Sequence, residues 1–464
     1  MSSSEQSELL SLSALQLARL IRQRELSIVE ITQFYLERIQ RHNANFGAFV
    51  RVTKRRALRR ARTLDQRTHK KSPDELPLFH GVPTGVKDLV PTLGVRTQYG
   101  SRAYKYFVPW FSAPVAQRMS HGGFISLGKL ATSELGVMPV TETKISPPAR
   151  NPWATDRTPG GSSGGSGAAV AAGLVPIAQA SDGGGSIRIP AAFTHQFGFK
   201  PSLSLLGNLN GPYNKLGLAV MGPISRTVED AAGMLDVMSG LPFSKVISGS
   251  CLAALQRPPS GLRIHLCLDS PVTTCEPEYA EATRKMATLL QSLGHTVTEV
   301  SPMQGSIDEF MPVWHYAVSR LPVVSEEVLQ PITKLLRKHG TNVSFSQAMS
   351  LLNSYAQRVD SFLEGADFAL TPTVPGRPPR IGTFDGEKDP KEAFDRAALL
   401  GSYTIPFNIN HGPAAAIPVA LTKDNLPISV QIGGRAGDDH RLLALCRQIE
   451  QAAPWCAKSA FAAP

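Results

Sequence analysis

Two clusters of glycine and serine carry the residue types in this chain that are best suited to bond cleavage. The first, residues 160–166, reads GGSSGGS, and the second, residues 183–186, reads GGGS. Glycines at this density let the backbone adopt positive φ and approach a ligand closely. Successive peptide N–H groups in such turns can converge on one anion or oxyanion. The two clusters therefore predict a site that stabilises negative charge.

A flexible linker is the alternative interpretation of so much glycine and serine. However, the run between the clusters is apolar and rich in alanine: residues 168–174 predict a buried helix, and residues 175–178 lead toward a short strand. A linker does not carry a core segment in its middle, so we favour a folded site.

A third segment strengthens this interpretation. Residues 81–88 read GVPTGVKD, Ser162 follows Lys87 by 75 residues, and Ser186 follows Ser162 by 24. Together with GGSSGGS and the GGSIRIPA segment at 184–191, this order and spacing resembles the amidase signature hydrolases. The weaker likeness extends from about residue 12 to about residue 450.

The resemblance implies a role for each of these residues. Ser186 would be the nucleophile, Ser162 a bridging serine that follows a cis peptide bond from Gly161, and Lys87 the base. The oxyanion hole would be formed by the backbone N–H groups of Gly183, Gly184, Gly185 and Ser186. Ser163, Asp182 and Arg188 would support the turn.

Such a lysine must be uncharged, although a free lysine has a pKa near ~10.4. Burial among apolar groups would lower that pKa, and the neighbouring Val86, Leu89 and Val90 are consistent with burial. The resemblance then implies acyl transfer to Ser186, release of the amine and hydrolysis of the acyl-enzyme, with no metal and no organic cofactor. We expect a hydrolase of carbon–nitrogen bonds other than peptide bonds.

The substrate is expected to be a small amide or carbamate. Many relatives have threonine or isoleucine where this chain has Gly183, and glycine where it has Ala180. This SDGGGS form of the segment looks closest to amidases that act on bulky, aryl or synthetic amides, nylon oligomers and urethanes.

Two other functions stay open from the sequence. Gly161-Ser162-Ser163-Gly164-Gly165 also fits G-x-S-x-G, so Ser163 could be the nucleophile of an α/β-hydrolase with His195, His265 or His411. That motif needs a preceding strand, and residues 154–159 do not predict one. The amidase subunit of a glutamine-dependent tRNA amidotransferase carries the same three segments but commonly has glutamine at the position of Ile189. A stand-alone amidase is therefore favoured.

The composition indicates the class of protein, its cellular compartment and its partners. The 464 residues are 42% hydrophobic and carry a net charge of +11. No apolar run is long enough to span a membrane, and the first residues do not resemble a signal peptide. Five scattered cysteines and eleven histidines without metal-ligand spacing favour a reduced, cytoplasmic protein without a metal site. We expect no nucleic-acid partner, and the sequence leaves a homodimer open.

The periodicity predicts an α/β fold, a single domain over 1–464 with a mixed, mostly parallel sheet between helical layers. We expect an N-terminal helical segment at about 8–70, a catalytic core at about 75–245 and a C-terminal half with a helical region at about 306–365, which the resemblance implies is variable. The basic stretch 51–71 predicts an amphipathic surface helix. The aromatic run 104–111 (YKYFVPWF) fits either core packing or the mouth of an apolar pocket.

Overall fold

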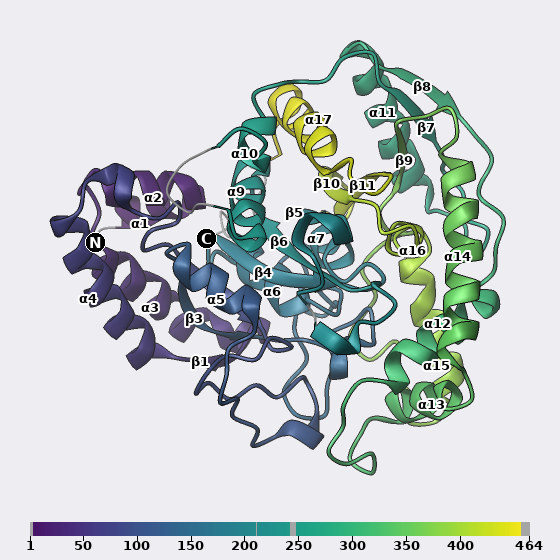
Figure 1. The fold of residues 1–464 in the computed structure, drawn as a ribbon, viewed down its shortest axis with the longest axis horizontal. Helices are drawn as coiled ribbons and strands as arrows, with labels where there is room; N and C mark the ends of the chain where they lie inside the picture. Colours follow the sequence, from purple (N-terminus) through teal and green to yellow (C-terminus); the bar gives the residue numbers. More distant parts are fainter. Residues whose placement is uncertain (1–2, 210, 242–246, 456–464) are drawn as a thin grey trace.

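One mixed sheet runs through the molecule in the computed structural model, which describes residues 3–209, 211–241 and 247–455 (Figure 1). Its strands are ordered β1-β3-β2-β4-β6-β5-β10-β11-β9-β7-β8. Their bounds are β1 Phe49–Val52, β2 Pro83–Lys87, β3 Ile125–Leu130, β4 Ile177–Asp182, β5 Phe197–Lys200, β6 Val220–Ser225, β7 Arg263–Leu266, β8 Thr296–Glu299, β9 Phe368–Pro372, β10 Ala414–Leu421 and β11 Pro427–Gly434.

Antiparallel pairing predominates in this sheet, which corrects one expectation. The strand pairs β2·β3, β2·β4, β7·β9 and β7·β8 are parallel. The other six pairs, which include the whole run from β4 to β9, are antiparallel. The mixed α/β class is confirmed, but the expected parallel majority is wrong. Parallel pairing needs crossover connections, and here these occur only toward the two ends of the sheet.

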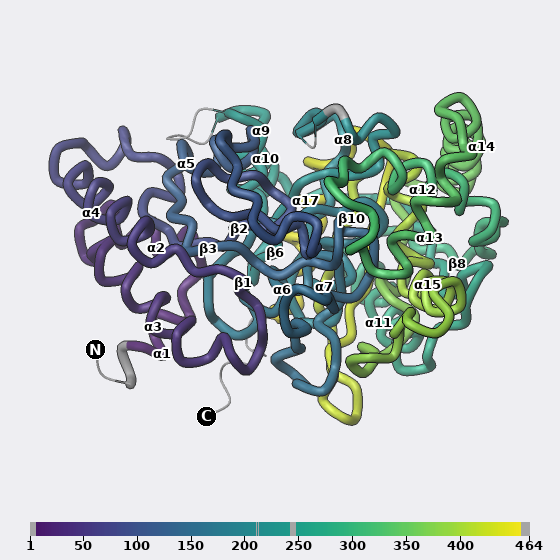
Figure 2. Tube along the Cα trace, turned by 90° about the horizontal axis from the view of Figure 1, so that it is seen from below, coloured from purple at the N-terminus to yellow at the C-terminus, as the bar shows by residue number. Residues whose placement is uncertain are grey.

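Helices cover both faces of the sheet. Helices α5, α9, α10 and α17 pack together on one face, and α6, α7 and α11 lie against the other (Figure 2). The bounds of the helices are α1 Ser3–Ser11, α2 Ala14–Arg22, α3 Ile28–Phe46, α4 Lys54–Lys70, α5 Pro114–His121, α6 Gly164–Ala171, α7 Arg188–Phe193, α8 Leu203–Leu206, α9 Val228–Ser239, α10 Cys251–Ala254, α11 Pro277–Ser292, α12 Ile307–Ser319, α13 Pro331–Gly340, α14 Phe345–Phe362, α15 Pro390–Ala398, α16 Pro406–Ile409 and α17 Asp439–Ala452.

Local signals set many of these bounds. The Ser27 side chain accepts a hydrogen bond from the Glu30 N–H and so caps the start of α3. The small residues of α6 are all buried beside β4, so the glycine and serine clusters flank a core helix. Strands β7 and β8 are parallel and, with α11 between them, form a βαβ unit. In the 306–365 region the chain forms α12, α13 and α14.

The aromatic run divides between core and surface. Tyr104 is buried and Phe107 half-buried in an apolar cluster with α12 and α13, whereas Tyr106, Val108, Trp110 and Phe111 are exposed. The basic stretch forms α4 as expected, with Ala57, Ala61 and Leu64 on its buried face. Across the described residues no helix is both long and apolar enough to cross a membrane. Cys456 lies outside the described residues.

Candidate active site

The last residue of β2 places an amine in the centre of the molecule. Lys87 has no solvent exposure. Its Nζ lies 2.7 Å from Ser162 Oγ, 3.0 Å from Ser181 Oγ and 3.4 Å from the Ser181 carbonyl oxygen. Its backbone N–H donates to the Gln179 side chain on β4, which fixes the end of the strand. Three oxygen atoms from two segments therefore surround one buried nitrogen.

Burial lowers the pKa of Lys87 from its ordinary value of 10.5 to about 7, although the charge of Asp182 raises it in part. Desolvation disfavours the ammonium form because the interior cannot replace its hydration. A substantial fraction of the Lys87 side chains is therefore neutral near pH 7, as a general base must be.

Ser162 lies in a closely packed turn. The Gly161–Ser162 peptide bond is cis. A Cβ on Gly161 would lie 2.5 Å from the Val140 backbone nitrogen, so only glycine fits there. Gly136 approaches from the other side, since a Cβ on it would lie 3.5 Å from Ser162 Oγ. The turn is thus held by close backbone contacts with the 136–140 segment.

A buried ion pair organises the second glycine cluster. Asp182 and Arg188 have no solvent exposure, and an Asp182 carboxylate oxygen lies 2.9 Å from an Arg188 guanidinium nitrogen. Arg188 also donates to the Thr404 carbonyl and to the Gln431 and Asn408 side chains. Burial alone would raise the pKa of Asp182, but the charge and hydrogen bonds of Arg188 outweigh it and hold that pKa far below its usual range. Asp182 is therefore ionised near neutral pH.

The same carboxylate changes the expected oxyanion hole. Asp182 accepts hydrogen bonds from the backbone N–H of Gly185 at 2.7 Å and of Ile187 at 3.1 Å. The Gly185 N–H is therefore occupied and does not fit the expected role. Within the described residues, the N–H groups of Gly183, Gly184 and Ser186 make no hydrogen bond, so they are the donors that could meet an oxyanion.

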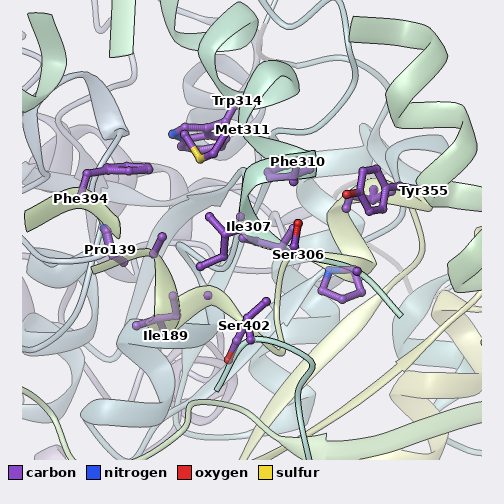
Figure 3. Close-up of a pocket in the computed structure, with 18 of the residues that line it drawn as sticks. Pro139, Ile189, Ser306, Ile307, Phe310, Met311, Trp314, Tyr355, Phe394 and Ser402 are labelled. Carbon is purple, nitrogen blue, oxygen red and sulfur yellow. The ribbon is translucent and has the colours of Figure 1, made fainter. Parts of the chain in front are cut away.

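Ser186 lies half-buried at an apolar pocket with about 120 Å³ of open space. Figure 3 shows Phe310, Met311 and Trp314 of α12 along one wall, with Pro139, Ile189 and Ser402 across from them. No charged side chain lines this pocket among the described residues. The Tyr355 hydroxyl at its edge already donates to Glu309. Such a pocket favours a neutral, apolar group.

The predicted site residues fall into a linked pair and a separate serine. Lys87 and Ser162 are in direct contact. In this structure no hydrogen bond joins the Ser186 hydroxyl to Ser162 or to Lys87, all three being described residues. Ser163 is buried, and its hydroxyl donates to the Ser181 carbonyl at 3.2 Å and accepts from the Ser181 N–H at 3.4 Å.

Ser163 also lacks the setting of a nucleophile elbow. The segment 154–163 forms turns and bends rather than a strand. Of the three candidate histidines, His265 bonds through Nδ1 to the Phe362 carbonyl at 2.9 Å.

Within the described ranges no group of three or more His, Cys, Asp or Glu side chains is placed to hold a metal ion.

Sequence reasoning missed Ser181, which contributes two of the three oxygen atoms around Lys87 Nζ. The sequence did contain a signal. Ser181 comes one residue before Asp182 near the end of the predicted strand, where alternate side chains point toward the helix that begins after Ser163.

Comparisons with known proteins identify the family of this chain. A family profile described as Amidase matches residues 30–443. The 6-aminohexanoate-cyclic-dimer hydrolase of Pseudomonas sp. (strain NK87) is 30% identical, with 95% of this chain and 94% of the relative covered. A solved structure of 6-aminohexanoate cyclic dimer hydrolase superimposes with a TM-score of 0.86 at 29% identity, covering 97% of this chain and 98% of the other.

A bacterial aryl acylamidase of the amidase signature family also superimposes with a TM-score of 0.86, at 26% identity and with 96% and 97% of the two chains covered. The family profile covers most of the chain, and the relatives are matched over nearly their whole length. This chain therefore belongs to the amidase signature family and is a hydrolase of carbon–nitrogen bonds other than peptide bonds.

Proposed function

We propose that the protein is a stand-alone amidase that cleaves a neutral carboxamide or carbamate through Ser186, Ser162 and Lys87. The observation that carries this proposal is the buried Lys87 amine, 2.7 Å from Ser162 Oγ and with a pKa of about 7. A neutral amine has two N–H donors and one lone pair. The two Ser181 oxygens can accept the donors, which leaves the lone pair for the Ser162 hydroxyl.

The reaction follows from that arrangement. Ser186 Oγ attacks the carbonyl carbon, and its proton moves through the Ser162 hydroxyl to Lys87 Nζ. The negative charge on the carbonyl oxygen is met by the N–H groups of Gly183, Gly184 and Ser186; removing one such donor typically costs about 3 kcal/mol of catalysis. The carbon–nitrogen bond breaks as the amine takes a proton back from Lys87 through Ser162. Water then attacks the acyl-enzyme by the same route and releases the acid.

The pocket narrows the substrate class. Its open space is on the order of the roughly 150 Å³ apolar cavity that holds a benzene ring. Its apolar walls offer no partner for an ammonium or carboxylate group, and an unpaired charge is costly there. Anilides, aryl carbamates and cyclic oligoamides fit this description, in agreement with the names of the two relatives.

The absence of charged side chains among the described residues that line the pocket counts against the amidotransferase subunit. That enzyme releases ammonia from glutamine, whose ammonium and carboxylate groups both need charged or polar partners. Ile189, which lines the pocket, stands where such subunits commonly have glutamine.

The test combines trapping with a substrate panel. A fluorophosphonate probe followed by peptide mapping should label Ser186, and Lys87→Ala should abolish both labelling and turnover. The panel contains anilides, aliphatic amides, cyclic oligoamides and aryl carbamates. Labelling of Ser163, or full turnover by the Lys87→Ala variant, would refute the mechanism. Failure of the whole panel with Ser186 labelled would refute only the substrate class.

A further inference from the structure

A second surface of the molecule combines exposed apolar side chains with positively charged side chains that form no salt bridge among the described residues. We name it the basic apolar face and define it by two sets of residues. Its apolar members are Val52, Leu93, Tyr106, Val108, Trp110 and Phe111. Its cations are Arg51, Lys54, Arg55, Arg56, Arg59 and Arg96.

Hydrogen bonds join the two segments that form this face. An Arg56 guanidinium nitrogen at the start of α4 donates to the Leu93 carbonyl at 2.8 Å. The Gly94 N–H donates to the Pro109 carbonyl at 2.9 Å, so the 93–96 and 106–111 stretches lie together. Two hollows, of about 530 and 770 Å³, are lined by side chains from both segments. The face is therefore one continuous, structured surface.

The apolar exposure is concentrated here. Ten large hydrophobic side chains are exposed among the described residues, and six of them belong to this face. Trp110 is 83% exposed, and its ring packs edge-on against Phe111 with 5.3 Å between centroids. Tyr104 and Phe107 of the same run are turned into the core. Trp110 and Phe111 stay exposed although they are equally apolar. Exposed apolar patches mark sites of association.

The charge of the face has one sign. Residues 49–64 contain seven lysines and arginines, residues 89–113 contain three, and neither segment contains an aspartate or glutamate. Over the described part of the chain, none of the six cations that define the face forms a salt bridge. Arg51 also acts on an internal carboxyl, since burial raises the pKa of Asp88 and the charge of Arg51 lowers it in part. For the other five cations, a partner with negative charge would not first have to displace an ion-paired carboxylate.

We propose that this face binds the surface of an anionic lipid bilayer. Basic residues would contact lipid phosphates, while Trp110, Phe111 and the aliphatic side chains enter the interfacial region, where aromatic rings are favoured. A second copy of this chain fits less well, because a two-fold contact would oppose the same positive charges. A nucleic-acid strand would use the rings and arginines but not the aliphatic Val52, Leu93 and Val108.

The attachment would be peripheral and separate from catalysis. In both views α4, which carries most of the cations, lies at the opposite end of the molecule from α12 (Figures 1 and 2). The 104–111 run reaches the α12 cluster through Tyr104 and Phe107, which are not members of the face. No residue of the basic apolar face lines the pocket at Ser186. The proposal therefore does not depend on the proposed function, and variants of this face should keep their activity on dissolved substrates.

The test is co-sedimentation of the full chain with vesicles. The protein should sediment with phosphatidylcholine vesicles that contain phosphatidylglycerol and stay in solution with phosphatidylcholine alone. High salt should release it, because the screening length falls from about 10 Å at 0.1 M to about 3 Å at 1 M. Single-stranded RNA added at equal charge should not compete.

Two variants with a matched control identify the surface. Arg55→Glu with Arg59→Glu, and separately Trp110→Ala with Phe111→Ala, should each weaken vesicle binding at least about tenfold while the melting temperature is unchanged. Lys334→Glu with Lys338→Glu makes the same charge change at the same spacing on exposed positions of α13 and should bind like the native protein. No binding to anionic vesicles, equal loss in the control, or a dimer that disappears in the Trp110/Phe111 variant would overturn the proposal.

Discussion

The Thr404 hydroxyl donates to the Gly184 carbonyl at 2.7 Å, and this bond joins the glycine turn before Ser186 to a segment 220 residues later in the chain. The same hydroxyl leaves no space beside the next residue. A Cβ on Gly185 would lie 2.3 Å from Thr404 Oγ1, and Gly185 has a φ of +126°. Thr404 thus constrains two consecutive residues, Gly184 and Gly185, of the turn that presents Ser186.

We predict opposite results for two glycine substitutions in this turn. Gly185→Ala should lower kcat at least about a hundredfold, because it must displace Thr404 and adopt a backbone conformation that disfavours side chains. Gly183→Ala should change kcat/KM only a fewfold, since its Cβ would meet Ala219 at 3.6 Å and Trp314 at 3.9 Å, which are ordinary contacts. Steady-state kinetics on one anilide checks both. Equal loss in the two variants would contradict this account of the turn.

The pH dependence should report the Lys87 amine. The base must be neutral, and its pKa is about 7. Below that pH kcat/KM should fall about tenfold per pH unit, and above it the rate should reach a plateau. The measurement is a pH–rate profile with a neutral substrate. A flat profile from pH 5 to 9, or a rate that falls as pH rises through 7, would exclude Lys87 as the base.

Stability should depend on pH through the same group. An unfolded lysine keeps its proton up to about pH 10.4, whereas folded Lys87 loses it near pH 7, so the unfolded chain binds more protons between these values. The Lys87 contribution to the free energy of unfolding therefore rises with pH across that window. Since the pKa is lowered from 10.5 to about 7, the rise is on the order of 5 kcal/mol.

Comparison with Lys87→Met isolates that contribution. The difference in unfolding free energy between the native protein and Lys87→Met should shift steadily in favour of the native protein from pH 7 to pH 10. Denaturant unfolding at several pH values measures it, with the exposed Lys285→Met as control. A difference that does not vary with pH would show that the folded amine stays charged.

The sequence pointed to Lys87 and Ser162 as partners, and in the structure they are in contact, whereas the catalytic roles of Lys87, Ser162 and Ser186 stay a prediction. Lys87, Ser162 and Ser186 each lie in a short glycine-containing segment, and the order and spacing of the three segments carried the resemblance that assigned them. The antiparallel centre of the sheet was not predicted, because β5 and β6 are short and their pairing with β4 and β10 depends on contacts distant in sequence. The pocket wall at Phe310, Met311 and Trp314 likewise follows from the docking of α12, which periodicity alone does not orient.

The buried Asp182–Arg188 pair should be important for stability as well as for activity. Asp182→Asn leaves the Arg188 guanidinium buried without its counter-charge, and breaking such a pair typically costs about 3–5 kcal/mol. It also weakens the hydrogen bonds that hold the Gly185 and Ile187 N–H groups. Both the melting temperature and kcat should fall. Asp395→Asn, which breaks the exposed pair with Lys391, should change neither; if the two variants behave alike, the ion pair does not organise the turn.

Charge on the substrate should decide turnover, because the pocket at Ser186 has no ionised side chain among its lining residues. We expect the anilide of a linear monoacid to be cleaved at least about tenfold more efficiently than the anilide of the matching diacid, whose free carboxylate would be left unpaired in an apolar site. The comparison of kcat/KM at constant pH measures this. Met311→Lys places a cation on the wall and should reduce the preference by favouring the diacid substrate. If the native enzyme cleaves both anilides equally well, the group that carries the charge must stay in solvent, and the pocket then binds the other side of the scissile bond.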